Sequence, residues 1–335
     1  MASMTHEMAY DGSLLTGLRA ALQVSHPAWA GAELRPLQDL GLAHLHVRLV
    51  GTGMLARIPK QSQMGLPPAA NLRHQQACFE RAWPSGQTPR LLGVLAVSPA
   101  LPRGALLVEV SAGRPAALPG DLDAMARALA AVHRLALPPS AQRPPLQDAH
   151  DPLRQLHAEI GAQAVHLRAA GLAADVLQAI EAQLRALDAL VGQPQRPPRC
   201  LIAFDAHPGN FLLRASGQAV LVDLEKCRYS YPGLDLAHAS LYTSTTWDLA
   251  TRTTLTLGQV CGFYAAWERA VDGRLAEACR LWHVPLRQAM WLWSLTWCCK
   301  WRALSGRPPG RPGQGEDWSA AQSDPGRVRH VRERV

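Results

Sequence analysis

The sequence predicts an α+β chain with two lobes, a small antiparallel sheet followed by a larger, mostly helical part. A length of 335 residues exceeds what one small core needs, so two lobes are expected. Leu and Ala dominate the composition, while Tyr and Phe number only five and four, which favours helices over sheets. Strand-like alternation is concentrated near the start of the chain. We therefore expect an N-terminal lobe over residues 1–110 and a helical lobe over residues 111–335.

The first lobe combines helical spacing with strand alternation. Leu45, Val47 and Leu49 alternate with polar residues, and the Gly-Thr-Gly sequence at 51–53 provides a tight turn before another apolar segment. This pattern predicts an antiparallel hairpin. The other expected elements are a helix over 13–30 that breaks at Pro27, a short helix over 71–82, and strands over 90–97 and 105–110 that are joined by a turn.

The second lobe begins after the sequence SAGRP, where the apolar spacing becomes helical. Asp121 is expected to cap a helix whose apolar positions are Leu122, Met125, Leu129 and Val132. One or two more helices are expected over 151–190, followed by a proline-rich linker. The sequence then predicts a strand at CLIAF, a small hairpin over 211–224, and helices to about residue 305.

Charge and cysteine content restrict the class of protein. The net charge of +8 is scattered, and no basic stripe is interleaved with aromatic residues, so we expect no nucleic-acid partner. The seven cysteines include no Cys-x-x-Cys pair, which is typical of a reduced compartment. We find no signal segment and no apolar run of roughly 18 residues. We therefore expect a cytoplasmic protein without a membrane partner, and the oligomeric state is not readable from the sequence.

A turn with acids and an amide around it carries the chemistry. In AFDAHPGNFLL, Asp205 and Asn210 lie on either side of a His-Pro-Gly turn, just before an apolar segment. Asp223 ends the second strand of the expected hairpin, so the hairpin should bring it close to Asn210. An amide oxygen and a carboxylate form a hard-oxygen site that suits Mg²⁺. Asp205 would then accept a proton from a hydroxyl. The alternative is that each residue only caps a turn.

These segments resemble the aminoglycoside phosphotransferase and choline kinase superfamily, which is related to the protein kinases. The family loop His-Gly-Asp-x-His-Pro-x-Asn corresponds to AFDAHPGN, and LVDLEKCRYSYPGLDLAH corresponds to the Ile-Asp-Phe-Glu and Asp-Leu-Ala block that follows. The resemblance covers about residues 30–300. It implies a bilobal protein-kinase-like fold with ATP and Mg²⁺ as cofactors. It also implies that Asp205 is the catalytic base, that Asn210 and Asp223 are metal ligands, and that Asp235 braces the catalytic loop.

The first lobe resembles the same superfamily. MLARIPK corresponds to the third strand, where the family carries a cation that reaches the nucleotide phosphates. This implies that Arg57 has that role, with Lys60 as the second candidate. GALLVEVSAG resembles the hinge, where backbone groups near Glu109 and Ser111 would pair with adenine. The family glutamate of the following helix has no clear counterpart, and its nearest candidates are Gln76 and Glu80.

The resemblance implies a kinase whose acceptor is a hydroxyl on a small molecule, which would be an amino alcohol such as choline or ethanolamine, a sugar, or an aminoglycoside. Ala203 and Phe204 replace the His-Gly of the family loop, so the alternative is a regulatory pseudokinase that binds nucleotide without phosphate transfer. Trp293, Trp297 and Trp301 share one helical face, either as core packing or as an aromatic wall for the acceptor. Nearby acids that could contact a cationic acceptor are Asp248, Glu268 and Asp272.

Overall fold

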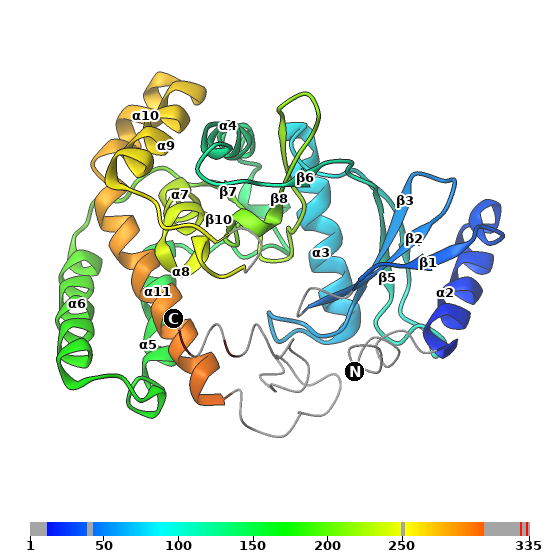
Figure 1. Cartoon of the computed structure of the whole chain (residues 1–335), viewed down its shortest axis with the longest axis horizontal. Coiled ribbons are helices and arrows are strands. Elements are labelled where there is room, and N and C mark those ends of the chain that lie inside the picture. Colours follow the sequence, from blue (N-terminus) through cyan, green and yellow to red (C-terminus); the bar gives the residue numbers. More distant parts are fainter. Residues whose placement is uncertain (1–11, 39–42, 249–251, 305–328, 330–332, 334–335) are drawn as a thin grey trace.

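A five-stranded antiparallel sheet forms the first part of the computed structural model, which describes residues 12–38, 43–248, 252–304, 329 and 333 (Figure 1). The strand order is β1-β2-β3-β5-β4. Figure 1 shows helix α2 on the outer side of this sheet and helix α3 between the sheet and the rest of the molecule. The strands are β1 (Leu34–Pro36), β2 (His44–Leu49), β3 (Met54–Pro59), β4 (Leu91–Leu95) and β5 (Ala105–Glu109), and the helices are α2 (Gly12–Ser25) and α3 (Pro68–Ala82).

The β2–β3 hairpin confirms the expected alternation. Val47 pairs with Ala56, and the apolar side chains of both strands pack in one buried cluster with Leu18 and Leu22 of α2. The turn needs glycine because Gly51 and Gly53 have φ angles of +80° and +72°. The polar residues of β2 lie on the opposite face, which is turned towards the second part of the chain.

The helical remainder contains two small sheets. Strand β7 (Cys200–Ile202) pairs with β10 (Arg228–Ser230), and β8 (Phe211–Leu213) pairs with β6 (Arg114–Pro115) and β9 (Ala219–Leu221). The long helix α11 (His283–Leu304) packs against α5 and α7. The other helices are α4 (Leu122–His133), α5 (Pro152–Ala164), α6 (Ala174–Gly192), α7 (Pro232–Ser240), α8 (Tyr242–Thr245), α9 (Leu257–Ala270) and α10 (Gly273–Arg280). Single 3₁₀ turns are η1 (Pro27–Trp29), η2 (Trp83–Ser85), η3 (Ser140–Gln142), η4 (Arg168–Ala170) and η5 (Pro208–Asn210).

Helix α3 joins the two parts through a shared core. Leu72 and Phe79 on one face of α3 belong to the same buried cluster as Met125 and Leu129 of α4. The shared core therefore fixes the position of α3 against the helical part. Residues from both parts of the chain can then meet in the space between them. The expected α+β class with a small antiparallel sheet and a helical remainder is confirmed. No helix of the described residues is long and apolar enough to span a membrane.

Some expected elements differ from those observed. The helix expected over 13–30 ends at Ser25, and a separate 3₁₀ turn follows it. The short strands β1, β6 and β10 were not expected, because two or three residues carry no readable alternation. The division at residue 110 stays a prediction; there the chain leaves β5, and β6 pairs with β8 of the second part.

Candidate active site

Asp235, in the first turn of α7, is the anchor of the loop that follows β7. Its carboxylate is fully buried and accepts hydrogen bonds from the backbone nitrogens of Ala203 (2.8 Å) and Phe204 (2.7 Å). His133 of α4 donates from Nε2 to the same carboxylate at 3.1 Å, while its Nδ1 accepts from Trp267 Nε1 at 2.9 Å. The hydrogen-bond pattern assigns the neutral Nε2–H tautomer to His133. The loop is thus fixed to two helices by one buried acid.

The His-Pro-Gly turn returns the amide of Asn210 to the start of the same loop. The backbone nitrogen of Asn210 donates to the carbonyl of His207 at 2.9 Å, and His207 Nδ1 accepts from the nitrogen of Gly209 at 3.2 Å. Asn210 Nδ2 then donates to the carbonyl oxygen of Asp205 at 2.8 Å. The turn therefore holds Asp205 and Asn210 together, and it leaves the amide oxygen of Asn210 available for a cation.

The β8–β9 hairpin brings Asp223 to the same place. The backbone nitrogen of Val222 donates to the carbonyl of Asn210 at 2.9 Å, so Asp223 follows directly opposite the end of the turn. Its Oδ1 accepts from Arg57 Nη2 at 2.5 Å, which links it to strand β3 of the first part. Burial raises the pKa of Asp223, but the Arg57 guanidinium outweighs this and holds it well below the usual range. Asp223 is therefore an ionised carboxylate.

Arg57 is also held by a buried group that the sequence did not reveal. His44 of β2 accepts from Arg57 Nη2 at Nδ1 (3.0 Å) and donates from Nε2 to Gln75 Oε1 (3.0 Å). Burial lowers the pKa of His44, so its ring is neutral. Glu225 Oε2 lies 3.6 Å from His44 Nε2, and burial together with Asp223 raises the pKa of Glu225 to about 8. His44, Asp223 and Glu225 each offer a ligand atom within 4.8 Å of the others.

The residue of α3 that points towards this group is neither Gln76 nor Glu80, the two candidates that the sequence offered for the family glutamate. Gln76 Nε2 donates to Glu80 Oε1 at 2.8 Å, and this pair lies on the exposed side of α3. Gln75 is buried and points to His44 instead. One residue turns the direction of a helical side chain by about 100°, so a shift of one position separates the exposed side from the buried side. An amide on α3 therefore contacts His44, which in turn contacts Arg57.

Asp205 lies in a pocket of cationic and neutral nitrogen atoms. Lys226 Nζ donates to Asp205 Oδ2 at 2.9 Å, and His238 Nδ1 lies 3.7 Å from Oδ1. Burial raises the pKa of Asp205, but the ammonium of Lys226, with His207 and His238, lowers it below the usual range. Burial lowers the pKa of His238 to about 4, so this ring stays neutral. Lys226 and His238 were not predicted as site residues, although both lie in the segment LVDLEKCRYSYPGLDLAH.

If Asp205 is the base of a phosphate transfer, as the family resemblance implies, Lys226→Met is expected to lose activity at a higher pH than the parent as the pH falls. Without the ammonium, the burial of Asp205 is no longer compensated, so its carboxyl takes up a proton earlier as the pH falls. An opposite charge at this distance lowers a pKa by about 1–3 units, so the acid limb of the kcat profile should move up by a similar amount. Lys226→Arg, which keeps the charge, is the matched control. An unmoved acid limb in Lys226→Met would show that Lys226 does not set the ionisation of Asp205.

The nucleotide candidates of the first part lie on or directly after the paired inner strands β3 and β5 of the sheet. Lys60 directly follows the end of β3, and Arg57, within β3, contacts Asp223. Glu109 ends β5, and its backbone nitrogen donates to the carbonyl of Arg90 at 2.9 Å. Ser111 follows it, and its buried hydroxyl has no hydrogen-bond partner among the described residues. Adenine contacts at Glu109 and Ser111 remain a prediction.

An acid and an aromatic cluster lie beside the catalytic loop. Asp248 Oδ2 would lie only 3.1 Å from a Cβ atom placed on Gly209, so its carboxylate reaches the turn. Trp247 packs edge-on against Trp297 (5.3 Å between ring centroids) and Trp301 (6.5 Å) of α11. Trp301 is buried, whereas Trp247 and Trp297 are half-buried. A carboxyl group and half-buried aromatic rings thus occur together beside the His-Pro-Gly turn.

The remaining aromatic and acidic candidates lie elsewhere in the helical part. Trp267 lies in the core against His133, and Trp293 Nε1 donates to Glu159 Oε2 at 2.9 Å. Glu268 pairs with Arg280 and His283 at the α9–α11 junction, and Asp272 caps α10 through the nitrogen of Leu275. Glu268 and Asp272 thus stabilise helix ends and junctions, whereas Asp248 lies beside Gly209 of the His-Pro-Gly turn.

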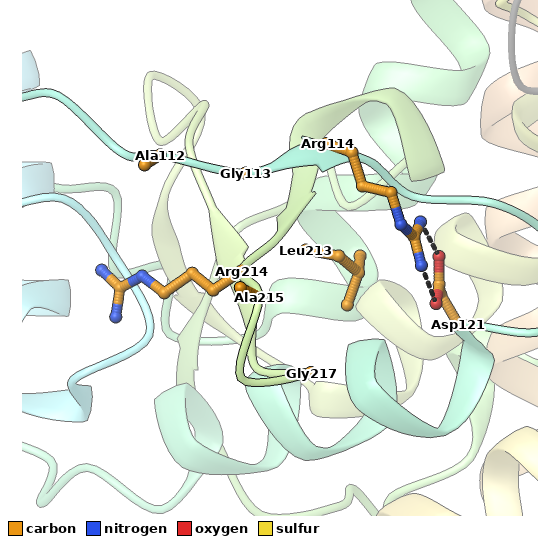
Figure 2. A pocket seen from close by; sticks show the side chains of 8 residues that line it. All are labelled: Ala112, Gly113, Arg114, Asp121, Leu213, Arg214, Ala215 and Gly217. Carbon is orange, nitrogen blue, oxygen red and sulfur yellow. Dashed lines mark hydrogen bonds and ion pairs between the residues drawn. The ribbon is translucent and has the colours of Figure 1, made fainter.

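An open hollow lies on another face, between β6 and the β8–β9 hairpin (Figure 2). Arg114 donates to both carboxylate oxygens of Asp121 at 2.6 and 3.0 Å, and Arg214 extends to the opposite side. Asp205, Asn210 and Asp223 are not among its lining residues. The expectation that the side chain of Asp121 caps α4 is wrong, because its carboxylate binds Arg114 and the backbone nitrogen of Ala117 instead.

The donor atoms around Asp223 fit a divalent cation of the Mg²⁺ type. Asn210 offers an amide oxygen, and Asp223 offers an ionised carboxylate, which are the hard-oxygen ligands that Mg²⁺ prefers. Glu225 Oε1 is buried and has no hydrogen-bond partner among the described residues. An unpaired buried acceptor costs free energy, which a cation or an ordered water would offset. The residues therefore suit an ion held between the turn and the hairpin.

The fold and this group of residues define a kinase-like phosphotransferase. Residues 39–282 match the model of the phosphotransferase enzyme family, and the chain therefore belongs to that family. This match confirms the resemblance seen in the sequence and the prediction that the chain is an enzyme of this class. No curated protein sequence matches the chain significantly.

Solved structures agree with this fold. A choline/ethanolamine kinase family protein from Mesorhizobium loti is 18% identical, with a TM-score of 0.58, over 96% of this chain and 94% of the other. Choline kinase LicA from Streptococcus pneumoniae is 14% identical, with a TM-score of 0.57, over 96% and 98%. A ternary complex of the aminoglycoside phosphotransferase APH(2″)-IIa with streptomycin and ATP is 12% identical, with a TM-score of 0.54, over 88% and 90%. At these identities the similarity concerns the fold.

Proposed function

We propose that the chain is an ATP- and Mg²⁺-dependent kinase that transfers the γ-phosphate to a hydroxyl of a small molecule. The observation that carries the proposal is the meeting of three segments between the two parts of the molecule. Asn210 contacts the backbone of Asp205, the hairpin brings Asp223 opposite Asn210, and Arg57 reaches across from the sheet to Asp223. The family match and the similar structure that contains ATP support the same assignment.

Positioning and neutralisation of charge account for most of the catalysis of phosphoryl transfer. Asn210 and Asp223 would hold Mg²⁺, which when bound neutralises the nucleotide phosphates. Arg57, next to Asp223, supplies a second cation that reaches the phosphates. Asp205 accepts a hydrogen bond from the acceptor hydroxyl and then its proton. The lowered pKa of Asp205 keeps it ionised and ready for this role at neutral pH.

A cationic amino alcohol is the acceptor class that the site supports best. Asp248 lies beside the turn that carries Asn210, its neighbour in the chain is the half-buried Trp247, and the half-buried ring of Trp297 packs against Trp247. A carboxylate and aromatic faces together attract an ammonium group. The similarity to choline and ethanolamine kinase structures agrees with this choice. With its ammonium near Asp248, an amino alcohol would direct its hydroxyl towards Asp205.

Release of ADP should be measured with the whole chain, ATP and Mg²⁺ against choline, ethanolamine, simple sugars and aminoglycosides. We expect turnover with an amino alcohol and little above background with the neutral sugars. Asp248→Asn is expected to raise KM for the amino alcohol by about tenfold, because a charge-assisted contact is lost, and to change KM for ATP little. Asp272→Asn, which alters an acid on α10, is the matched control.

The same assay separates the alternatives. Turnover with a sugar or an aminoglycoside would keep the kinase and overturn the amino alcohol assignment. ADP release with no acceptor on the panel, together with measurable binding of ATP, would favour the nucleotide-binding pseudokinase. The geometry favours the active enzyme, because the loop with Ala203 and Phe204 is still fastened by Asp235 and still carries Asp205.

A further inference from the structure

Phe204 occupies a backbone conformation that L-residues rarely adopt. Its φ angle is +61°, and it is the single non-glycine residue with a positive φ among the residues that the structure describes. The family loop has glycine at this position, and glycine adopts this conformation without strain. A large side chain here must therefore be stabilised by its surroundings. Phe204 also directly precedes Asp205, so its backbone angles set the direction of the next side chain.

The ring of Phe204 is enclosed by a closed set of contacts. The guanidinium of Arg228 lies 3.6 Å from the ring centroid, and the ring of Trp293 packs edge-on at 4.9 Å. Glu159 joins these two neighbours, since it accepts from Arg228 Nη1 at 2.8 Å and from Trp293 Nε1 at 2.9 Å. Phe204 is 1% exposed. The four residues come from α5, the loop, β10 and α11, which are distant in sequence.

We propose that Phe204 is a positioning residue for Asp205: its ring, clamped between Arg228 and Trp293, holds the loop at a positive φ and so aims the catalytic carboxylate. The inference rests on the proposed function in that Asp205 is the base. A planar guanidinium over a desolvated aromatic face is a favourable cation–π contact, and Glu159 orders both partners. The backbone nitrogen of Phe204 also donates to Asp235, so the ring contacts and this hydrogen bond fix the same stretch of the loop together.

This clamp differs from simple filling of space. A filler requires only apolar volume, which leucine supplies, whereas the clamp requires a π face for Arg228. If Phe204 were merely tolerated at a glycine position, Phe204→Gly would cost no activity, because glycine adopts a positive φ without strain. Leucine and glycine thus test the two parts of the proposal separately.

The experiment compares Phe204→Leu and Phe204→Gly with Phe263→Leu, a change at an equally buried phenylalanine of α9. We expect both Phe204 variants to lower kcat by about 10- to 100-fold while KM for ATP changes less than about twofold, because misplacing a catalytic group affects the transition state more than binding. Phe263→Leu should lose stability and retain kcat. Hydrogen exchange at the amides of Ala203 and Phe204 is the second readout, and both Phe204 variants should exchange faster.

Retention of kcat in Phe204→Leu would overturn the requirement for the aromatic face, and retention in Phe204→Gly would overturn the clamp as a whole. If neither variant folds, Trp293→Phe replaces them, since it keeps a ring against Phe204 and removes the hydrogen bond to Glu159; unchanged kcat and exchange in this variant would overturn the proposal. If the parent enzyme transfers no phosphate to any acceptor, the proposed function fails. Hydrogen exchange then decides the clamp alone, and unchanged exchange rates would overturn it.

Discussion

Asp205→Asn is expected to lower kcat by about 10²- to 10⁴-fold, the range for loss of a general base. The amide keeps the shape of the carboxylate, but it cannot take the proton of the acceptor hydroxyl. Affinity for ATP with Mg²⁺ should stay nearly unchanged, because the contact of Arg57 with Asp223 does not involve the side chain of Asp205. The measurements are kcat by ADP release and nucleotide affinity by calorimetry, and Asp205→Ala should behave similarly.

Asp188→Asn provides the control, because its carboxylate is exposed on α6 and pairs with His157. It should match the parent in rate and in affinity for ATP. A parental rate in Asp205→Asn would remove Asp205 as the base and leave its ion pair with Lys226 as a structural contact. A parallel loss of ATP affinity would mean instead that the neutralised site had rearranged.

The candidate site was readable from the sequence where local order sets the geometry. Asp205 and Asn210 are five positions apart around a proline–glycine turn, and Asp223 ends the hairpin that begins after the turn. Turn chemistry and hairpin pairing are local, so the convergence around Asn210 follows from spacing alone. The structure has this turn and this hairpin. The catalytic, metal and nucleotide roles remain proposals.

The residues that reach the site from a distance were not readable. His44 reaches Arg57 across the β2–β3 hairpin, and Gln75 reaches His44 only because α3 packs beside the sheet, which is a property of tertiary packing and not of spacing. Lys226 was not among the predicted site residues, although it pairs with the half-buried Asp205. Phe204 looked like a loss of the family pattern. Its stabilising neighbours, Arg228 among them, come from other parts of the chain.

Asp235→Ala is expected to lower the free energy of unfolding by about 3–5 kcal/mol, because several buried donors lose their acceptor and each unsatisfied donor costs about 1–3 kcal/mol. The side chain is fully buried, and three donors point at it: the nitrogens of Ala203 and Phe204 and Nε2 of His133. Alanine leaves all three without an acceptor in a dry environment. Asp235→Asn should recover part of this loss, because the amide still has one acceptor oxygen. The recovery is incomplete because its NH₂ group, itself a donor, faces the remaining donors.

Asp272→Ala is the matched control, because Asp272 also accepts a backbone N–H at the start of a helix but is exposed. Loss of such a cap costs about 1 kcal/mol, so urea unfolding should separate the two variants clearly. A loss in Asp235→Ala no larger than in Asp272→Ala would show that the loop finds other acceptors. If Asp235→Ala is destabilised more than Asp272→Ala, we also expect a lower kcat for Asp235→Asn, even under conditions in which that variant is folded. The helices would keep Asp235→Asn folded. The direction of Asp205, however, depends on the hydrogen bonds from the nitrogens of Ala203 and Phe204, which go to two different carboxylate oxygens, and the asparagine amide has only one oxygen to accept them.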